Sequence, residues 1–382
     1  MHDITFQKIR NLSDLSKNLS ILESDLDQLL KCDPQSILYH KMLIPKKSTK
    51  YQGFRTVYKV INPTLSLIQK NLETSINNST KFPPCVQGFV RKRSTVTNAN
   101  KHLGKKFALS CDIRNYFESI NIEAVIRAFQ YLGCSLEIAE MLAKLCTLDG
   151  FLVQGVSTSP VLANIVSRDM DKELLSLSKH YNCSYTRYAD DITISGDDVV
   201  PSRDEIDEIL KKNGFHLNHD KFKIQKRGQK QYVTGLTVFD EKYPRVPKRI
   251  KKWLRLNLFY INKYGFESHA CKILNIERQD LESDETKREE VNDYCDELNR
   301  KLKGWIDYIN SVESKLAKKL YEQYNLIIEK ERSNRNSERV NNNGRVTVLH
   351  LPLKSRDKKR NEIETRDSAL FLLNKLYTRF KF

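Results

Sequence analysis

The sequence has no apolar run long enough to cross a bilayer, and its N-terminus lacks the basic and then apolar pattern of a secretion signal. It also lacks any Cys-x-x-Cys pair, since its eight cysteines are scattered and several lie in apolar stretches. This distribution predicts reduced core cysteines and argues against a zinc site or a disulfide framework. We find no internal repeat. We therefore expect a cytoplasmic protein that has no membrane partner.

Acidic residues are outnumbered in this chain. Asp and Glu number 48 against 65 Lys and Arg, which gives a formal charge of +17 over 382 residues. Such an excess favours a polyanionic partner, because each phosphate that a protein neutralises releases counterions. The alternative is a basic surface without a partner. With 39% apolar residues the chain can bury a core, and its length favours two or three subdomains.

Hydrophobic periodicity predicts the elements of the N-terminal part. Leucines recur at three- and four-residue steps from Leu12 to Leu30, which indicates one or two amphipathic helices with Ser24 as a candidate cap. Residues 42–60 are expected to form a strand pair around a basic turn at 46–53. A helix over 63–77 is expected to follow.

Apolar runs and turn residues predict the next elements. The run Phe107–Ile113 is mostly apolar and contains Asp112, which indicates a buried strand that delivers this carboxylate to the edge of a sheet. The other expected elements are a helix over 122–132 that stops at Gly133, one helix from Ser159 and Pro160 to about Leu177, a strand, acidic tip and strand over 186–195, and a helix around 206–210 that ends at Gly214.

The sequence changes character at about Pro247, where long charged helical sequence without strand alternation begins. Trp305 lies in an apolar stripe of this region and is expected to pack in its core. Residues 332–345 are polar and Asn-rich, which indicates a linker. A strand-like run at 346–353 and a final helix over 368–380 are expected after it.

An acidic pair is expected at a hairpin tip. Tyr188-Ala189-Asp190-Asp191 lies between two strand-like runs, so four carboxylate oxygens would project into one small volume. Hard cations such as Mg²⁺ bind such oxygens, and the like charges would otherwise repel each other. The alternative is an ordinary polar turn, in which Asp is common.

Asp112 supplies a carboxylate from a second strand. Two metal ions about 4 Å apart need carboxylates from more than one strand, and in that arrangement one ion lowers the pKa of an attacking hydroxyl while the other stabilises the leaving pyrophosphate. The protein would mainly position charge in this chemistry. Asp112 could instead be a turn residue at the end of a strand.

Four motifs follow one another in a fixed order. They are Asp112 with Tyr116-Phe117, then Gln154-Gly-Val-Ser-Thr-Ser-Pro160, then Tyr188-Ala-Asp-Asp191, and then Gly214-Phe-His-Leu-Asn-His-Asp-Lys221. This order resembles the fingers and palm of reverse transcriptases over about residues 40–240. The resemblance implies an α+β, right-hand polymerase fold of four parts: an N-terminal helical segment (1–40), fingers and a palm with an antiparallel sheet (41–245), a helical thumb (246–331), and a linker with a small C-terminal extension (332–382).

The resemblance also assigns roles to single residues. It implies that two Mg²⁺ ions are held by Asp112, Ile113, Asp190 and Asp191, of which the three aspartates are catalytic. For the incoming dNTP it implies Tyr116, Phe117 as the aromatic gate against a ribose 2′-hydroxyl, Gln154 on the nucleotide, and Arg55 and Lys221 near the triphosphate. The alternatives are a core position for Phe117, an ordinary loop for Gln154 and solvated surface charges for Arg55 and Lys221.

Two shorter motifs resemble those of bacterial retron reverse transcriptases. Asn98-Ala-Asn-Lys-His102 is similar to their Asn-Ala-x-x-His motif, and Val233-Thr234-Gly235 is similar to their Val-Thr-Gly motif. His102 could instead be a hydrogen-bonded surface histidine, and Thr234-Gly235 a plain turn. The segment from about residue 332 onward departs from the compact form of these enzymes.

The retron resemblance implies an enzyme that binds its own structured noncoding RNA. It would start DNA synthesis from the 2′-hydroxyl of an internal guanosine and leave a branched RNA–DNA hybrid, in an antiphage defence system with an effector protein as partner. The expected RNA contacts are Asn98, His102, Val233, Thr234 and Gly235, with the basic residues Arg91, Lys92, Arg93, Lys248, Arg249, Lys251 and Lys252 as phosphate grips. Each basic run could instead be a solvated face.

Two rival interpretations remain. One is another reverse transcriptase, of the group II intron or diversity-generating type, although an intron maturase should carry a longer basic domain after the thumb. The other is a reverse transcriptase fold that acts as an RNA-binding scaffold and restrains a defence effector. The intact acidic triad argues against lost catalysis in the second case.

Overall fold

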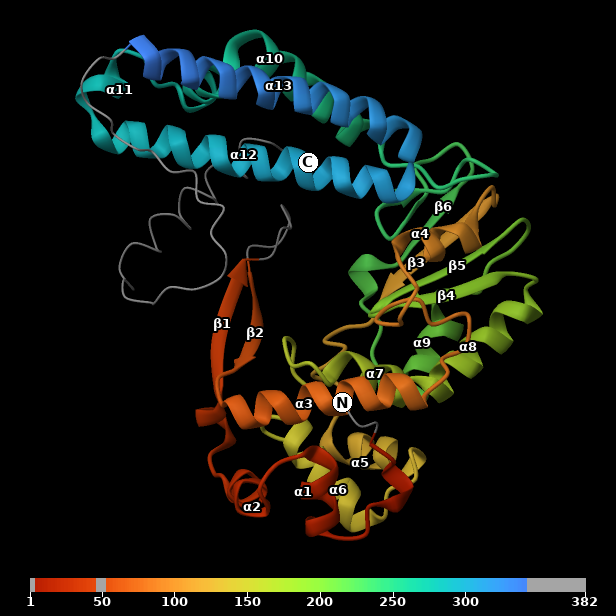
Figure 1. Cartoon of the computed structure of the whole chain (residues 1–382). Coiled ribbons are helices and arrows are strands. Elements are labelled where there is room, and N and C mark those ends of the chain that lie inside the picture. The colour runs from red at the N-terminus through yellow and green to blue at the C-terminus, as the bar shows by residue number, and fades with distance from the viewer. Residues whose placement is uncertain (1–3, 46–52, 342–382) are drawn as a thin grey trace. The chain divides into compact units, whose positions relative to one another are not determined.

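The computed structural model describes residues 4–45 and 53–341, and side chains as far as residue 333. Contacts divide the chain into two units, one of residues 1–42 and 57–327 and one of residues 43–56 and 328–382. Helices and an antiparallel sheet occur together in the first unit (Figure 1). The expected α+β class is therefore confirmed.

The N-terminal helices form where the leucine pattern predicts them. They are α1 (Leu12–Leu19) and α2 (Glu23–Lys31), between the 3-10 turns Phe6–Lys8 and Gln35–Leu38. Asn11 caps α1 by accepting a hydrogen bond from the backbone N–H of Asp14. Ser24 is not the cap expected for the second helix, because α2 begins one residue before it and Leu22 occupies the cap position without a side-chain bond.

A strand pair and a long helix follow. Strands β1 (Tyr39–Pro45) and β2 (Phe54–Val60) pair as predicted, and the expected basic turn lies outside the described residues apart from Gly53. Helix α3 (Pro63–Ser79) begins with Pro at its first position and is capped by Asn62, whose side chain accepts from the Leu65 N–H. It ends two residues later than the sequence predicts.

A four-stranded antiparallel sheet lies at the centre of the first unit, with the strand order β4-β5-β3-β6 (Figure 1). These strands are β3 (Phe107–Asp112), β4 (Ser184–Tyr188), β5 (Asp191–Gly196) and β6 (Lys223–Lys226), and a separate short pair consists of β7 (Tyr232–Val233) and β8 (Leu236–Thr237). The register places Asp112 opposite Asp191. The predicted strand and hairpin are thus confirmed.

Neighbouring residues of β4 contact different parts of the molecule, because successive side chains of a strand point to opposite faces. Thr186 contacts the 3-10 turn Asn100–His102, which follows helix α4 (Thr95–Ala99). Tyr185 and Arg187 contact helix α8 (Arg168–His180). Both faces of β4 are therefore covered.

The expected single helix from Ser159 to about Leu177 is wrong. Two helices are present, α7 (Ser159–Val166) and α8, and Thr158 rather than Ser159 occupies the first cap position. The break falls at Ser167, whose ψ is near 1° and whose hydroxyl is hydrogen-bonded to that of Tyr116 at 2.9 Å. A serine that bonds elsewhere competes with the helix, which local periodicity does not reveal.

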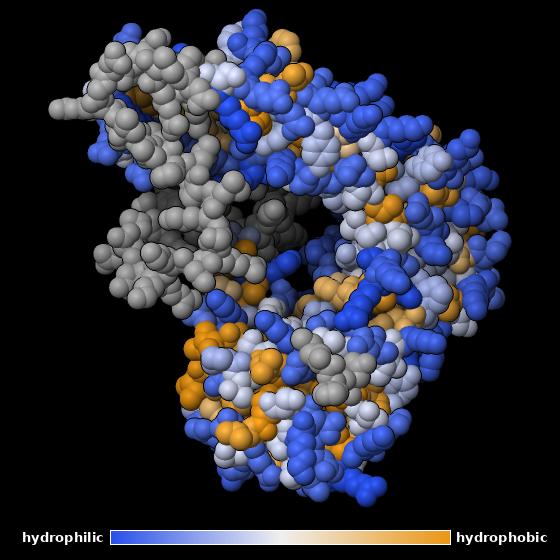
Figure 2. Space-filling view, viewed as in Figure 1, coloured by the Kyte–Doolittle hydropathy of each residue, from blue (hydrophilic) through white to orange (hydrophobic). Residues whose placement is uncertain are grey.

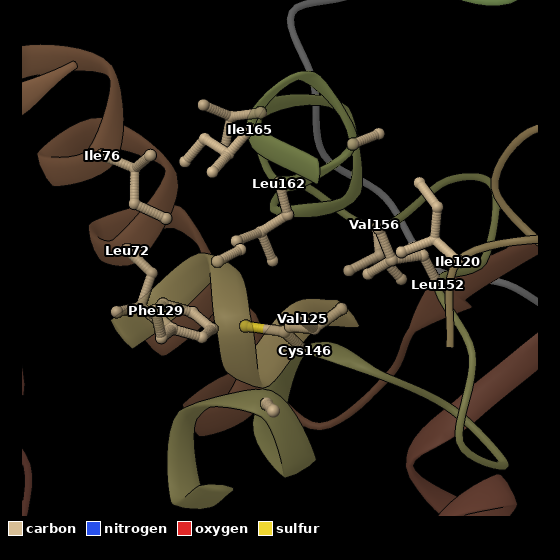
Figure 3. Packing of buried hydrophobic residues seen from close by; sticks show 14 of the residues in the cluster. Leu72, Ile76, Ile120, Val125, Phe129, Cys146, Leu152, Val156, Leu162 and Ile165 are labelled. Atoms are coloured by element: carbon tan, nitrogen blue, oxygen red, sulfur yellow. The ribbon is translucent and has the colours of Figure 1, made fainter. Parts of the chain in front are cut away.

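The main core lies among the helices around the sheet. Besides α3 and α7 it involves α5 (Ile122–Tyr131) and α6 (Leu136–Cys146), whose apolar faces meet (Figure 3). Phe129, Leu72 and Cys146 are all fully buried there. All eight cysteines are free, as the sequence predicts. Helix α9 (Arg203–Lys212) follows β5 and ends shortly before Gly214, which has φ +79°.

Three long helices and one short helix follow from residue 248 in the described part of the chain. They are α10 (Lys248–Leu274), which is interrupted at Gly265, α11 (Asp280–Ser283), α12 (Glu285–Val312) and α13 (Ser314–Asn341). α10 packs against α12, and Trp305 is half-buried beside Tyr308. The linker expected from residue 332 is partly wrong, because α13 continues to Asn341 through a stretch that contains neither Gly nor Pro.

The remaining C-terminal expectations, a strand-like run at 346–353 and a helix over 368–380, lie outside the described residues. On the face drawn in Figure 2, hydrophilic side chains cover most of the described surface of the long C-terminal helices. Within residues 4–45 and 53–341, no helix is both long and apolar enough to cross a membrane.

Candidate active site

The three predicted catalytic carboxylates meet at one end of the central sheet. Asp112 ends β3, Asp191 begins β5 opposite it, and Asp190 lies in the tip between β4 and β5. The backbone N–H of Ile113 donates to the Asp190 carbonyl at 2.9 Å, which fixes the tip against the end of β3. The sheet therefore brings together the residues that the sequence places about 80 positions apart.

A lysine neutralises part of this charge. Lys221 Nζ lies 2.7 Å from Asp112 Oδ2. Asn218 holds the same aspartate twice, since its side-chain amide donates to Asp112 Oδ1 at 3.3 Å and its backbone N–H donates to the Asp112 carbonyl at 2.8 Å. Asn218 stands in the fourth motif, but the sequence alone gave it no role.

The carboxylates repel one another. The pKa of Asp190 is raised, mainly by loss of hydration and to a smaller extent by repulsion from Asp112. Loss of hydration, followed by repulsion from Asp190 and Asp112, raises the pKa of Asp191 to about 7, and Lys221 opposes both shifts. Because the Asp191 residue is exposed to solvent, we attribute its raised pKa mainly to repulsion from the other two carboxylates.

This donor set suits a hard divalent cation. Carboxylate oxygens are the ligands that Mg²⁺ prefers, and a cation between them would relieve the repulsion that raises both pKa values. Among the described residues, no three Asp, Glu, His or Cys side chains converge at ligand distances as they stand. The Lys221 ammonium supplies the positive charge beside Asp112 in this conformation.

Two of the expected nucleotide contacts, Phe117 and Tyr116, differ in how far they are buried. Phe117 is half-buried, and its ring lies 6.2 Å from that of Phe89 and 5.4 Å from that of Tyr116. Tyr116 is buried, and its hydroxyl donates to the Ala163 carbonyl at 3.2 Å. Tyr116 therefore has a packing role beneath Phe117, whichever role Phe117 has.

The Gln154-Gly155 loop is fixed against β2. The Tyr58 N–H donates to the Gln154 carbonyl at 2.7 Å, and the Gln154 side chain donates to Glu118 Oε1 at 3.4 Å. Gly155 has φ +99°, and a Cβ there would lie 2.3 Å from the Tyr58 carbonyl oxygen. Only glycine fits this approach. Arg55 is exposed on β2 and belongs to the second unit.

Not all of the predicted RNA contacts are free to reach a ligand. Arg91 and Lys92 are exposed, and Arg91 donates to Asn78 Oδ1 at 2.7 Å. Arg93 turns inward instead, because its guanidinium donates to the carbonyls of Phe82, Pro83 and Val86. Its charge therefore holds a protein loop together.

The Asn98–His102 and Val233–Gly235 motifs contact each other. The Asn98 amide lies 3.5 Å from the Thr234 hydroxyl, which donates to the Thr95 carbonyl at 3.1 Å. Asn98 and Val233 are buried. Thr234 and Gly235 both have positive φ, so the motif forms a tight turn.

His102 is fully buried against one face of the hairpin that β4 and β5 form. Its Nδ1 is hydrogen-bonded to the Ser195 hydroxyl and its Nε2 to the Thr186 hydroxyl, both at 2.7 Å. Burial, together with the charge of Lys101, lowers its pKa to about 3. With both nitrogens taken and no exposed surface, His102 has no atom to offer to RNA in this conformation.

The basic start of α10 is largely open to solvent. Lys248, Arg249 and Lys252 are exposed. Lys251 is instead mostly buried and its Nζ lies 2.7 Å from Glu313 Oε1, and Glu313 is the single residue between α12 and α13. Lys251 therefore links α10 to the junction of α12 and α13. Its position in a basic run of the sequence did not indicate this role.

Comparison with known proteins places these features in a family. Residues 44–267 match the family described as "Reverse transcriptase (RNA-dependent DNA polymerase)". The chain is 33% identical to the retron Mx65 reverse transcriptase of Myxococcus xanthus over 52% of its own length and about half of that relative (51%). It is 26% identical to the retron Ec86 reverse transcriptase of Escherichia coli over 82% of its own length and 88% of the relative's.

A third relative is matched over most of its length. The retron Ec73 reverse transcriptase of Escherichia coli is 30% identical over 57% of this chain and 76% of its own. A solved apo telomerase structure from Candida tropicalis matches with a TM-score of 0.38 at 13% identity, over 58% of this chain and 60% of that one, and this likeness carries no weight. The chain belongs to the reverse transcriptase family, and within it to the bacterial retron reverse transcriptases.

Proposed function

We propose that this chain copies a cognate structured RNA into a short single-stranded DNA that stays linked to the RNA as a branch. The observation that carries the polymerase chemistry is the meeting of Asp112, Asp190 and Asp191 at one end of the sheet, with Lys221 beside them. Retron relatives support the kind of template. The net charge of +17 suits a polyanionic substrate and product.

Asp112, Asp190 and Asp191, with the Ile113 backbone, are the residues that would hold two Mg²⁺ ions. When bound, these ions lower the pKa of the attacking hydroxyl and stabilise the leaving pyrophosphate. Asn218 would hold Asp112 in place, because its side chain donates to the carboxylate and its backbone N–H donates to the Asp112 carbonyl. On metal binding, the Lys221 ammonium would be released from Asp112 and turn to the triphosphate of the incoming dNTP.

The neighbouring groups would select and orient the nucleotide. Phe117 packs on Phe89 and Tyr116, so its ring has a fixed place from which it can exclude a 2′-hydroxyl. Gln154 lies on a loop that Gly155 allows to pack closely on β2. Arg55 would grip the triphosphate from β2.

The remaining parts would serve RNA binding and regulation. Arg91, Lys92, Lys248, Arg249 and Lys252 are exposed and suit phosphate contacts, which position a nucleic acid without reading its sequence. Initiation would use the 2′-hydroxyl of an internal guanosine in the cognate RNA. The chain would act in the cytoplasm in an antiphage defence system, with an effector protein as partner and the extension after α13 as its docking element.

The substitution Asp190→Asn tests the assignment of the metal site. It should abolish DNA synthesis on the cognate RNA and leave RNA binding within about twofold of wild type, because it removes one charged ligand and no phosphate contact. Asp198→Asn, the same change on an exposed residue beyond β5, is the matched control and should keep full activity. Full DNA synthesis by Asp190→Asn would refute the assignment of Asp190 as a metal ligand.

A second measurement addresses the branched product. Protein purified with its upstream transcript should carry a short DNA that resists RNase and remains covalently attached to RNA through a 2′ linkage. If polymerase activity is present but this species is absent, the chain copies RNA in another way than the retron scheme requires.

A further inference from the structure

A buried arginine lies directly beside the catalytic tip. Arg187, three residues before Asp190, is among the largest fully buried side chains. Its guanidinium forms a two-point ion pair with Asp171 of α8, in which Nε donates to Oδ1 at 2.8 Å and Nη2 donates to Oδ2 at 2.7 Å. A buried charge is retained only with such compensation, so the pair is a fixed feature of the fold.

The remaining nitrogen of this guanidinium reaches the tip. The two N–H groups of Arg187 Nη1 are shared among three acceptors, the Ala189 carbonyl at 3.1 Å, the Tyr116 hydroxyl at 2.8 Å and Asn164 Oδ1 at 3.0 Å. One side chain therefore joins α8, α7, the segment that carries Phe117, and the residue immediately before Asp190. None of these bonds is needed to pair β4 with β5, because the strands pair through their backbones.

The tip needs such support because its backbone is in an unfavourable region. Ala189 has φ +58°, a left-handed conformation that side chains other than glycine adopt at a cost. The conformation is held from the other side by Gly88, where a Cβ would lie 2.3 Å from the Ala189 nitrogen. Strained residues persist only where the surroundings fix them.

A loop also holds the backbone of Arg187 at the outer edge of β4. The Arg187 N–H donates to the Cys85 carbonyl at 2.8 Å, and the Gln87 N–H donates to the Arg187 carbonyl at 2.7 Å. Arg93 fastens this loop through its bonds to Phe82, Pro83 and Val86. Asn164, which accepts from Arg187, also donates to the Gly88 carbonyl at 3.0 Å. The loop, the arginine and the tip thus form one connected set.

We propose that Arg187 is a positioning residue for catalysis. It fixes the left-handed turn at Ala189 so that Asp190 and Asp191 face Asp112, and through the Tyr116 hydroxyl it ties this turn to the Phe117 segment. This inference rests on the proposed polymerase function. Arg187 does not touch the substrate; it acts through Ala189 and Tyr116.

Two substitutions separate positioning from folding. Arg187→Lys keeps a charge for Asp171 but cannot make the three Nη1 bonds, and Tyr116→Phe removes only the hydroxyl that accepts one of them. The matched control is Tyr181→Phe, which removes a hydroxyl that donates to Glu205 at 2.8 Å, away from the tip. Arg187→Met serves as the variant that loses the charge as well.

The measurements are kcat and KM for dNTP on a primed homopolymer RNA, the affinity for Mn²⁺ alone followed by electron paramagnetic resonance, and the melting temperature. Tyr116→Phe should lower kcat about fivefold and Arg187→Lys roughly tenfold or more, the loss expected for one and for several hydrogen bonds, with KM within about twofold. Both should bind Mn²⁺ more weakly, whereas Tyr181→Phe should match wild type. Arg187→Lys should retain more activity than Arg187→Met.

The outcomes are distinguishable. A wild-type protein that neither extends the primer nor binds Mn²⁺ overturns the proposed function and this inference with it. If wild type is active and Tyr116→Phe and Arg187→Lys match the Tyr181→Phe control, the positioning role is overturned alone. A fall in kcat that follows the melting temperature, with Mn²⁺ affinity unchanged, reduces Arg187 to a stability residue and likewise overturns it. If Arg187→Lys does not fold, Tyr116→Phe decides the question.

Discussion

His102 should make the stability of the protein depend on pH in a defined window. The imidazole is buried between Thr186 and Ser195, and burial lowers its pKa from an ordinary value of 6.5 to about 3. Between these two values the unfolded chain binds a proton at this residue and the folded chain does not. Stability is therefore fully present above about pH 6.5 and is lost progressively as the pH falls toward 3.

The size of the effect follows from the two pKa values. Each pH unit in this window changes the free energy of unfolding by about 1.4 kcal/mol for one proton. Lowering the pH from 7.5 to 5 should therefore cost about 2 kcal/mol through His102 alone. The other histidines and the carboxylates add their own pH dependence, which makes a variant that differs only at His102 necessary.

The comparison is between wild type and His102→Gln in denaturant unfolding at pH 7.5 and pH 5. The variant should be less stable at pH 7.5, because the buried hydroxyls of Thr186 and Ser195 lose their partner. Each hydroxyl left without a partner lowers the free energy of unfolding by about 1–3 kcal/mol. It should nevertheless lose about 2 kcal/mol less than wild type on acidification. The His102 imidazole signal can be assigned in nuclear magnetic resonance spectra, because it is present in wild type and missing in the variant. This signal should not titrate between pH 8 and pH 5. A parallel loss of stability in both proteins, or a titration near pH 6.5, would refute the buried neutral histidine.

Further predictions concern selectivity, the nucleotide loop, the metal site and the C-terminus. Phe117→Ala should relax discrimination against ribonucleotides by roughly tenfold or more, measured as the ratio of kcat/KM for dNTP and NTP, and unchanged selectivity removes the gate role. Gly155→Ala should destabilise the protein by about 1–2 kcal/mol and raise KM for dNTP, because its φ is +99° and Tyr58 blocks a Cβ; an unchanged melting temperature and KM would show that the loop can move away. Mg²⁺ affinity, followed by calorimetry, should fall as the pH drops below about 7, where Asp191 takes up a proton that competes with the ion, and a flat profile from pH 8 to 6 contradicts this. Deletion of residues 342–382 should spare DNA synthesis and lose a protein partner, whereas a dead polymerase would make this segment part of the catalytic body.

The elements that carry the acidic triad could be predicted because their signals are local. The strand that ends at Asp112 is a mostly apolar run, and the hairpin at Asp190 alternates on either side of an acidic pair. A strand period or a helix cap depends on residues within a few positions of each other. The sequence order of the motifs then supplied the family, which the comparisons confirmed.

The roles of several basic residues could not be predicted, because their partners lie far away in the sequence. His102 bonds to hydroxyls 84 and 93 positions away, and Lys251 pairs with Glu313 62 positions away. Arg93 stands beside two exposed basic residues, yet only Arg93 turns toward backbone carbonyls. Composition and spacing treat all of these as surface charge. Burial is a property of the assembled fold, and it decides which of them remain available for RNA.

Arg187 shows the same limit at the most informative place in the sequence. It stands next to Tyr188 in the motif that first indicated metal chemistry, and a charged residue on the core-facing side of a strand is unusual enough to signal a buried partner. The structure identifies that partner as Asp171, which lies on α8 four residues after the break at Ser167. The helix expected as one piece from Ser159 to Leu177 was wrong at the same position. The break and the buried ion pair are linked through one atom, because the Tyr116 hydroxyl is hydrogen-bonded to Ser167 at the break and accepts from Arg187 of the ion pair.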